Sequence, residues 1–334
     1  MNNCINRFTR HGWKNYKRNN LHFIFQSATN PWMEPLFRDN IAKIIKKFKL
    51  SYFYYLYHRL RFFFIGKPII PTSLEYVVTT HCTMRCKECN TFIPYFSKDS
   101  QLKPVTFEQF KHDIDTLLKS VDFIYALGFV GGEPLLAKDL AKMINYAATK
   151  KQIRHIFIAT NCTILPSEDL IEALKHQKVS VQLSDYKNVK FLNKITSKFD
   201  TFKSILLKNN IHFNALHNLA EAKFMNMPSV YKDSQPKEAQ KTFDSCFGRF
   251  CNMLCDGILT QCTISVYIAR NKELSDDICH ELIDIRKSTP DELTNKIIQF
   301  YAKDYSAFCH YCHWNPIPQF SPCGEQVERG KSHE

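Results

Sequence analysis

The chain has 334 residues, and 44% of them are hydrophobic, which excludes a disordered chain and allows a large buried core. A chain of this length usually contains about two domains. The formal net charge is +13, and the 13 cysteines are an odd number. The N-terminal residues are polar and basic and lack the apolar stretch of a secretory signal. We therefore expect reduced, metal-binding thiols in a cytoplasm, because the cysteines come at short spacings and no signal is recognised.

The basic charge is concentrated in residues 1–67, which contain 13 Lys or Arg and two acidic residues. Apolar residues recur in this extension at helical spacing and predict one long amphipathic helix: Ile41, Ile44, Ile45, Phe48, Tyr52, Leu56, Leu60 and Phe63. No apolar run reaches the roughly 18 residues of a membrane-spanning helix. Three partners suit the predicted helix: the main domain of this chain, an anionic membrane surface, and, as the least favoured, nucleic acid.

Strand-like and helix-like segments alternate after the extension. We expect strands over Leu74–Thr80, Phe123–Val130, Arg154–Thr160, Val179–Leu183 and Ile211–Leu216. Between them we expect helices over Thr106–Ser120, with Thr106 as the N-cap, and over Lys138–Lys150, Ser167–Gln177 and Val189–Lys208. This alternation predicts a parallel sheet with helices outside it. Parallel barrels carry their chemistry at the carboxyl ends of the strands, so functional residues are expected there.

Three cysteines follow the first expected strand at the spacing Cys-x3-Cys-x2-Cys, namely Cys82, Cys86 and Cys89. A closed structural zinc site takes four protein ligands, and a cubane iron–sulfur cluster is normally held by four thiolates. Three thiols on one loop therefore favour a [4Fe–4S] cluster that leaves one iron open to a small molecule. The alternative is a zinc site that takes a fourth ligand such as His81.

A second marker follows the second expected strand: Gly131, Gly132, Glu133 and Pro134. Adjacent glycines let the backbone approach a ligand, because neither has a Cβ. Together with the cysteine loop, this segment resembles the radical S-adenosylmethionine (SAM) superfamily. The resemblance implies that the open iron chelates the amino and carboxylate groups of SAM. It also implies that the Gly-Gly-Glu-Pro segment holds the SAM amino group, so a side chain at Gly132 would occupy the space of the methionine part.

The ends of the next two strands offer further candidates for SAM contacts. The resemblance places Asn161 near the SAM carboxylate or ribose, and Ser184 and Asp185 near the ribose. The alternative roles are an Asx-turn for Asn161 and a helix cap for the Ser-Asp pair. Cys162 stands where the family often has glycine, and Glu88 stands where it often has an aromatic residue near adenine. No catalytic side chain is assigned.

A further group of cysteines follows the expected barrel: Cys246, Cys251, Cys255, Cys262, Cys279, Cys309, Cys312 and Cys323. Asp256-Gly257 is a hairpin signal that would bring Cys251 and Cys262 together. The spacing resembles the SPASM or twitch extensions of radical SAM enzymes, which carry two auxiliary [4Fe–4S] clusters or one. One cluster fits better, because only Cys323 follows Cys312.

The ligands implied for this auxiliary cluster are Cys262, Cys309 and Cys312, with Cys246 or Cys251 as the other. A structural zinc site with four cysteines is the alternative. The expected fold is α/β, a partial (β/α)6 TIM-like barrel over residues 68–228. Residues 1–67 form its basic, aromatic-rich helical extension, and residues 229–334 form the small Cys-rich domain.

The resemblance implies an enzyme that cleaves SAM reductively, makes a 5′-deoxyadenosyl radical and abstracts hydrogen from a substrate. The first expectation for the substrate is a peptide or protein. The alternatives are a sugar or lipid-linked saccharide of cell-surface polysaccharide synthesis, and a non-catalytic zinc protein. The reducing partner would be a flavodoxin or ferredoxin. We expect a cytoplasmic protein, peripheral to the inner face of the membrane if the helix binds lipid.

Overall fold

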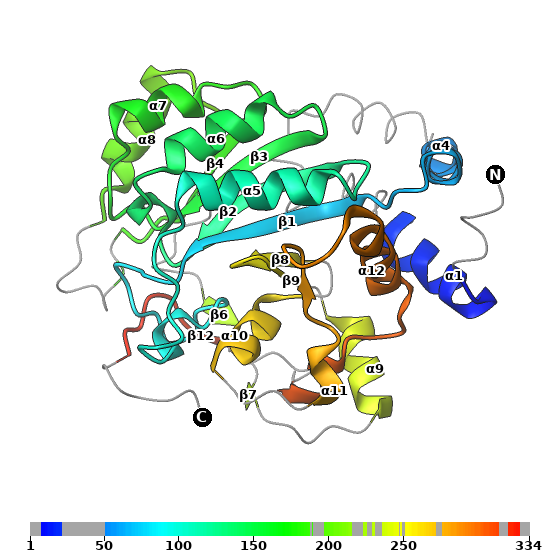
Figure 1. Ribbon diagram of the computed structural model, residues 1–334. Coiled ribbons are helices and arrows are strands. Elements are labelled where there is room, and N and C mark those ends of the chain that lie inside the picture. The colour runs from blue at the N-terminus through cyan, green and yellow to red at the C-terminus, as the bar shows by residue number, and fades with distance from the viewer. Residues whose placement is uncertain are drawn as a thin grey trace.

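The largest element of the fold is an eight-stranded sheet in the order β10-β9-β8-β1-β2-β3-β4-β5 (Figure 1). The computed structural model describes residues 8–21, 51–187, 189, 197–215, 223–225, 229–230, 236–246, 248, 251–271, 276–313 and 320–327. Two small two-stranded sheets, β7 with β11 and β6 with β12, lie outside the large one. The α/β class with a mostly parallel sheet, predicted from the alternating segments, is confirmed.

Five consecutive strands of this sheet are parallel: β1 (Ile70–Thr79), β2 (Ile124–Gly131), β3 (Ile153–Thr160), β4 (Val179–Leu183) and β5 (Phe213–Ala215). The helices that connect them lie together on one face of the sheet (Figure 1): α5 (Phe107–Leu118), α6 (Leu140–Thr149), α7 (Glu168–Leu174) and α8 (Phe199–Lys208). Each overlaps a predicted helix. The last was predicted from Val189, whereas the described helix begins only at Phe199.

The strand β1 shows why these segments form a buried sheet. Its residues alternate between two packed faces, and Leu74 and Tyr76 point into the core shared with Phe110 and Ile114 of α5. Thr106 caps α5 as predicted, because its hydroxyl accepts from the Gln109 backbone N–H and the Gln109 side chain returns to the Thr106 N–H. Strands that are covered on both faces have nearly continuous apolar sequences.

The Cys-rich segment continues the same sheet on the other side of β1. β8 (Cys251–Cys255) runs parallel to β1, and the antiparallel strands β9 (Ile258–Thr260) and β10 (Ile283–Asp284) follow it. The predicted hairpin between β8 and β9 is present. Its two turn residues, Asp256 at φ 51° and Gly257 at φ 76°, take the left-handed conformations that such a turn requires. Within the described residues, the sixth parallel strand is therefore β8.

Several further elements complete the described fold, and those labelled α9, α10 and α11 lie below β8 and β9 in Figure 1. The further elements are α9 (Pro236–Ser245), α10 (Thr263–Asn271), α11 (Asp276–Cys279), α12 (Pro290–Ala302), the short strands β6 (Lys223–Met225), β7 (Ser229–Val230), β11 (Cys312–His313) and β12 (Phe320–Pro322), and the 3-10 helices Ile93–Tyr95, Pro134–Leu136 and Ala307–Tyr311. α12 is closed at its start by a second capping box, formed by Thr289 and Glu292.

The first described residues of the extension pack on α12. α1 (Arg10–Tyr16) continues into a π-helical turn, Lys17–Leu21. Asp304, just after α12, accepts hydrogen bonds from the side chains of His11 at 2.7 Å and Asn15 at 2.8 Å. Asn19 donates to the Tyr301 backbone carbonyl. These contacts attach the start of the extension firmly to the body of the protein.

The second described part of the extension is α4 (Ser51–Ile65), and it uses a different face from the one the sequence pattern suggested. Tyr55, His58 and Phe62 are buried against the body, whereas Tyr52 and Leu60 of the predicted apolar stripe are 67% and 49% exposed. The predicted residues from Ile41 to Phe48 lie outside the described residues. The helix is fixed in this orientation by the Arg61 guanidinium, which donates two hydrogen bonds to the buried Asp122 carboxylate.

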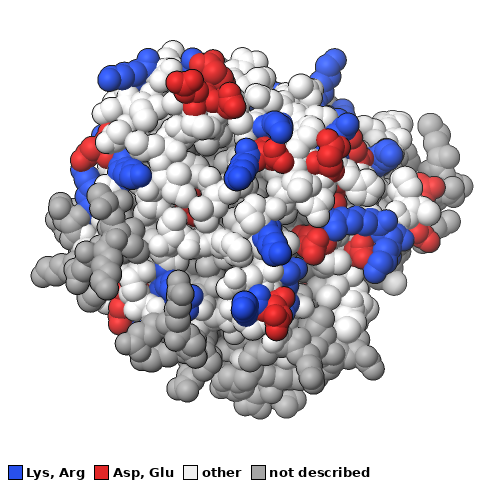
Figure 2. Space-filling model, turned by 60° about the vertical axis from the view of Figure 1, so that its left-hand side comes forward, with Lys and Arg blue, Asp and Glu red and all other residues white. Residues whose placement is uncertain are grey.

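Among the described residues, no helix has the length and apolar character needed to cross a membrane. Figure 2 shows Lys and Arg side chains interspersed with Asp and Glu over the described surface of one face. This mixture agrees with the small net charge that the sequence leaves to residues outside the extension.

Candidate functional site

The carboxyl ends of the parallel strands meet at one edge of the sheet, and each carries a segment that the sequence singled out. The cysteine loop follows β1, the Gly-Gly segment ends β2, Asn161 follows β3 and Ser184 follows β4. Backbone hydrogen bonds join neighbouring segments: Gly132 N–H donates to Thr79 O at 2.8 Å, and Ser184 N–H donates to Thr160 O at 3.0 Å. The predicted location of the site at this edge follows from the parallel topology.

Each sulfur of the cysteine loop has a polar group directed at it. The Met84 backbone N–H and the Asn161 side-chain amide donate to Cys82 Sγ at 3.4 and 3.6 Å. The Gln326 amide donates to Cys86 Sγ at 3.7 Å, and the Thr91 hydroxyl lies 3.2 Å from Cys89 Sγ. Hydrogen bonds to the sulfurs are one of the means by which proteins tune bound iron–sulfur clusters.

Without a bound metal, the buried environment of Cys82 and Cys86 favours their neutral thiol form. Burial raises the pKa of Cys82 and of Cys86 to about 12, and the neighbouring thiols add to both shifts. A bound metal reverses this preference, because it deprotonates the thiols that coordinate it. Cys82, Cys86 and Cys89 all lie at one strand end, each with a polar neighbour, and are the residues that would hold a [4Fe–4S] cluster.

The two glycines at the end of β2 allow the backbone to pass against the start of the cysteine loop. A Cβ on Gly132 would lie 2.0 Å from the His81 carbonyl oxygen and 3.0 Å from the Cys82 Cβ. A Cβ on Gly131, which has a φ of 135°, would lie 2.1 Å from the Thr79 carbonyl oxygen. From the resemblance, the space at Gly132 was expected to belong to SAM. The structure gives a more direct reason why position 132 is glycine: a side chain here would displace the cysteine loop itself.

Glu133 is fully buried, and its carboxylate is bonded to protein groups. It accepts hydrogen bonds from the Thr160 hydroxyl at 2.9 Å, the Asn161 backbone N–H at 2.9 Å and the Leu135 backbone N–H at 3.2 Å. Burial raises its pKa to about 7. The side chain was expected to accept a bond from the SAM ammonium, but the structure directs it to the end of β3. Pro134 begins the 3-10 helix that follows.

Asn161 lies directly beside the cysteine loop. Its side-chain amide also donates to the Thr83 hydroxyl at 3.0 Å, while its carbonyl oxygen accepts from the Thr163 backbone N–H at 3.0 Å, as in an Asx-turn. Cys162 has a φ of 58°, so it adopts the left-handed conformation that glycine takes easily. The turn geometry typical of glycine is thus kept although the residue is cysteine.

The end of β4 contributes a mostly structural segment. Asp185 accepts from the Lys187 backbone N–H at 3.0 Å, which closes a local turn. Ser184 and Asp185 are both partly exposed at the edge of the site, as a ribose contact would require. Next to them, Tyr186 is buried beside Cys86, with which it shares a hydrogen bond. No role was predicted for Tyr186 from the sequence.

The sequence comparison agrees with this geometry. Residues 76–206 match the profile of the Radical SAM superfamily. This chain carries a radical SAM domain. The match runs from β1 to α8 and includes the cysteine loop and all four strand ends described above. It confirms the superfamily predicted from the cysteine loop and the Gly-Gly-Glu-Pro segment.

Several curated proteins share part of this sequence. A GTP 3′,8-cyclase of Clostridium botulinum is 26% identical over 182 residues, which cover 47% of this chain and 53% of the relative. A GTP 3′,8-cyclase of Campylobacter jejuni is 29% identical over 181 residues. An S-adenosylmethionine-dependent nucleotide dehydratase of Selenomonas ruminantium is 37% identical over 75 residues, 22% of this chain and 26% of the relative. The chain thus spans about half the length of the GTP cyclases.

Solved structures with a similar course of the chain include two SAM complexes. BtrN in complex with AdoMet and 2-DOIA matches with a TM-score of 0.45 and 16% identity, covering 66% of this chain and 81% of BtrN. The anSMEcpe structure with AdoMet and the Cp18Cys peptide matches with a TM-score of 0.43 and 15% identity, covering 68% and 83%.

The radical SAM domain has an ionisable residue inside the sheet that sequence reasoning missed. Glu75 lies on β1 between Leu74 and Tyr76, which face the helices, so it points to the opposite face. Its carboxylate is 3.4 Å from the Ser73 hydroxyl, and burial raises its pKa to about 7. Its charge also acts on Cys251. The sequence feature that could have revealed Glu75 is a single acidic residue within an otherwise uncharged strand.

Four of the predicted auxiliary thiols lie near one another. Burial raises the pKa of Cys251, Cys262 and Cys309, and neighbouring thiols add to each shift. Cys246 is one of the neighbours in all three cases, so the structure brings both Cys246 and Cys251 to Cys262. Cys312 is buried in β11 and lies in the core cluster against which Cys262 packs.

Among the described residues, no three His, Cys, Asp or Glu side chains are grouped closely enough to hold one metal ion.

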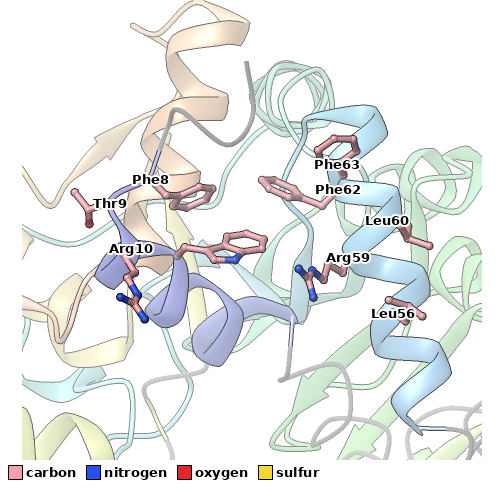
Figure 3. A pocket seen from close by; sticks show the side chains of 9 residues that line it. Phe8, Thr9, Arg10, Leu56, Arg59, Leu60, Phe62 and Phe63 are labelled. Atoms are coloured by element: carbon pink, nitrogen blue, oxygen red, sulfur yellow. The ribbon is translucent and has the colours of Figure 1, made fainter. Parts of the chain in front are cut away.

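A second surface feature lies between α1 and α4 (Figure 3). It is a cavity of about 680 Å³, lined by Phe8, Thr9, Arg10, Trp13, Leu56, Arg59, Leu60, Phe62 and Phe63. Figure 3 shows Arg10 from α1 and Arg59 from α4 below Phe8 and Phe62. The cavity therefore combines a largely apolar wall with two guanidinium groups.

Proposed function

We propose that this radical SAM enzyme binds a [4Fe–4S] cluster through Cys82, Cys86 and Cys89 and cleaves SAM reductively beside it. The observation that carries the proposal is the set of polar contacts to all three sulfurs at the edge where the Gly-Gly segment meets the loop. When bound, the cluster supplies the electron that turns SAM into methionine and a hydrogen-abstracting 5′-deoxyadenosyl radical. A flavodoxin or ferredoxin is the class of reductant that suits this step.

The chain's own residues hold and shape the site. Glu133 fixes the ends of β2 and β3 relative to each other, and Asn161 connects the end of β3 to Cys82. The glycines at the end of β2 allow close contact with the loop. Ser184 and Asp185 remain available to a ribose at the neighbouring strand end. Such preorganisation orients a reactive group and keeps stray donors away.

The four neighbouring thiols Cys246, Cys251, Cys262 and Cys309 are the proposed ligands of one auxiliary [4Fe–4S] cluster, with Cys312 as the further candidate. Their grouping around the β8–β9 hairpin supports this assignment. Glu75 on β1 lies close enough to this group for its charge to act on Cys251. The first proposed substrate class is a peptide or protein, because SPASM-like extensions often serve such substrates.

A second substrate class, a lipid-linked saccharide, is favoured by the cavity between α1 and α4. An apolar wall of this size with two guanidinium groups suits an anionic lipid, and the exposed aromatic residues of α4 extend the apolar surface. We propose that this surface binds the anionic leaflet of a membrane, as the basic extension suggests. A nucleotide is the third class to test, since the matched relatives are named for reactions of nucleotides.

The test is SAM cleavage by the reconstituted protein under oxygen-free conditions. With dithionite as reductant, the wild type should release methionine and 5′-deoxyadenosine, and Cys89→Ala should release neither. The substrate class is then assigned by which additive increases 5′-deoxyadenosine formation and becomes modified: a peptide library, lipid-linked saccharides or nucleotides. A wild type that binds its metal but never cleaves SAM would contradict the proposed function.

A further inference from the structure

The C-terminal segment Cys323–Val327 lies directly on the cysteine loop, about 240 positions away in the sequence. Lys87 N–H donates to Glu325 O at 2.7 Å, and Val327 N–H donates to Arg85 O at 2.8 Å. Cys86 and Gln326 form an antiparallel bridge between these bonds. The loop that holds the predicted cluster ligands is therefore paired with the end of the chain, like two short strands.

Gln326 fixes the loop through its side chain. Its carbonyl oxygen accepts from the Arg85 backbone N–H at 2.6 Å. Its amide nitrogen donates to the Gly324 carbonyl at 2.8 Å and to Cys86 Sγ at 3.7 Å. The same side chain thus holds the backbone before Cys86, the turn after Cys323 and the Cys86 sulfur itself. The result is a fixed distance between Cys86 and the chain at Cys323.

Cys323 is 2% exposed and packs with Met84 and Tyr186 in a small core that Cys82 and Cys86 also contact. Its thiol lies close enough to raise the pKa of Cys86, whose shift is dominated by burial. Gly324 makes this placement possible: its φ is 79°, and a Cβ there would lie 2.7 Å from Val189 Cγ1. A fourth thiol therefore lies beside two of the three loop cysteines, Cys82 and Cys86.

We propose that Cys323 is the fourth thiolate ligand of the radical SAM cluster when SAM is absent, and that SAM displaces it. The proposal rests on the proposed function, because it requires a cluster with one open iron at Cys82, Cys86 and Cys89. On exchange, the Fe–S bond to Cys323 breaks, and bonds form from iron to the SAM nitrogen and carboxylate oxygen. The SAM ammonium loses one proton, and the released Cys323 thiolate takes up one, so charge and protons balance. No electron is transferred in this step.

Such a ligand would keep the open iron from water and other ligands until SAM arrives, and it would lower the apparent affinity for SAM. If the closed state holds about 90% of the SAM-free protein, removal of the thiol tightens SAM binding about tenfold. The exchange also predicts a change at Cys323 itself, since a thiolate bound to iron does not react with alkylating agents.

The test compares alkylation of Cys323 by N-ethylmaleimide in the cluster-loaded protein with and without saturating SAM, read by mass spectrometry of the peptides. Cys323 should be protected without SAM and alkylated with it. Cys279, which is exposed on α11, serves as the internal control and should react equally in both samples. Protection of Cys323 in both states would overturn the proposal, because simple burial would not respond to SAM.

A variant tests the same idea without chemical labelling. Cys323→Ala should retain the iron content of the wild type, bind SAM about tenfold more tightly and lose one iron of the cluster more readily on oxidation, seen by electron paramagnetic resonance. Cys279→Ala is the matched control. Unchanged SAM affinity and unchanged oxidation behaviour in Cys323→Ala would also overturn it. If the wild type itself held no cluster, the proposed function would fail first, so the two failures are distinguishable.

Discussion

The carboxylate of Glu133 accepts a hydrogen bond of 2.9 Å from the backbone N–H of Asn161, which joins the ends of β2 and β3 at the site. Asn161 in turn donates to Cys82 Sγ. The buried Glu133 therefore helps to position Asn161, which contacts the Cys82 sulfur. This connection explains how the second strand end can influence the cluster loop without binding a ligand.

Glu133→Ala should destabilise the protein. The Thr160 hydroxyl and the backbone N–H groups of Asn161 and Leu135 would lose their buried acceptor, at a cost of about 1–3 kcal/mol. Urea unfolding measures this as a lower midpoint at an unchanged slope. The exposed Glu172→Ala is the control and should change the free energy of unfolding by less than about 0.5 kcal/mol. Equal midpoints for the two variants would show that the Glu133 contacts contribute little.

Gly132→Ala should lower the iron content of the protein as well as its affinity for SAM. The added Cβ would lie 2.0 Å from the His81 carbonyl oxygen, so the loop that carries Cys82 must move. Iron analysis after identical reconstitution measures the loss, which we expect to reach about four irons per chain, the content of one cubane. Gly12→Ala, on α1, should keep the full content. A Gly132→Ala protein with normal iron and weak SAM binding would instead support a glycine reserved for the ligand.

Glu75→Gln should alter the pH dependence of stability. Burial raises the Glu75 pKa to about 7 in the folded protein, above its ordinary value. A group whose pKa is higher in the folded than in the unfolded protein contributes fully to the free energy of unfolding in acid. This contribution is lost as the pH rises through about 7. Because glutamine cannot ionise, the variant should gain stability relative to the wild type between about pH 5 and pH 8.5, by up to about 3 kcal/mol. Urea unfolding of cluster-free, reduced protein tests this. If the free energies of unfolding of the wild type and the variant changed in parallel with pH, the prediction would be refuted.

The surface of α4 should bind anionic vesicles. Basic residues near such a surface contribute about 1 kcal/mol each at low salt, and Leu60 and Phe64 add exposed apolar area. We expect co-sedimentation of the full chain with phosphatidylserine-containing vesicles. Leu60→Ser with Phe64→Ser should weaken it at unchanged charge. Leu207→Ser, at an exposed apolar residue of α8, is the control. If the wild type stays in the supernatant at low salt, this surface has another partner.

Local sequence signals were sufficient for the strands, the capped helix α5 and the Asp256-Gly257 hairpin, because apolar runs, capping boxes and turn residues act within a few positions. The three thiols and the Gly-Gly segment were recognisable for the same reason. The pairing of Gln326 with Cys86 left no such signal, since it depends on the packing of two distant loops. The orientation of α4 was also misjudged: it has apolar residues on both faces, and the contact between Arg61 and Asp122 selects one.

The role of Glu133 shows a further limit of local reasoning. Its position in the Gly-Gly-Glu-Pro segment indicated a ligand contact, but whether a side chain turns outward or inward depends on the donors that the neighbouring strand presents. Here the end of β3 offers two donors, the Thr160 hydroxyl and the Asn161 backbone N–H, and the carboxylate turns toward them. Cys162 illustrates the opposite case, in which a departure from glycine left the local backbone conformation unchanged.

The most direct test of the central claim is the metal content and cluster type of protein made in iron-replete, oxygen-free conditions, measured by elemental analysis and Mössbauer spectroscopy. We expect about eight irons per chain from two [4Fe–4S] clusters. Cys82→Ala combined with Cys86→Ala should remove about four of them and abolish the release of 5′-deoxyadenosine, while the irons held by the auxiliary thiols remain. Recovery of zinc alone, with no iron lost in the double variant, would contradict the account.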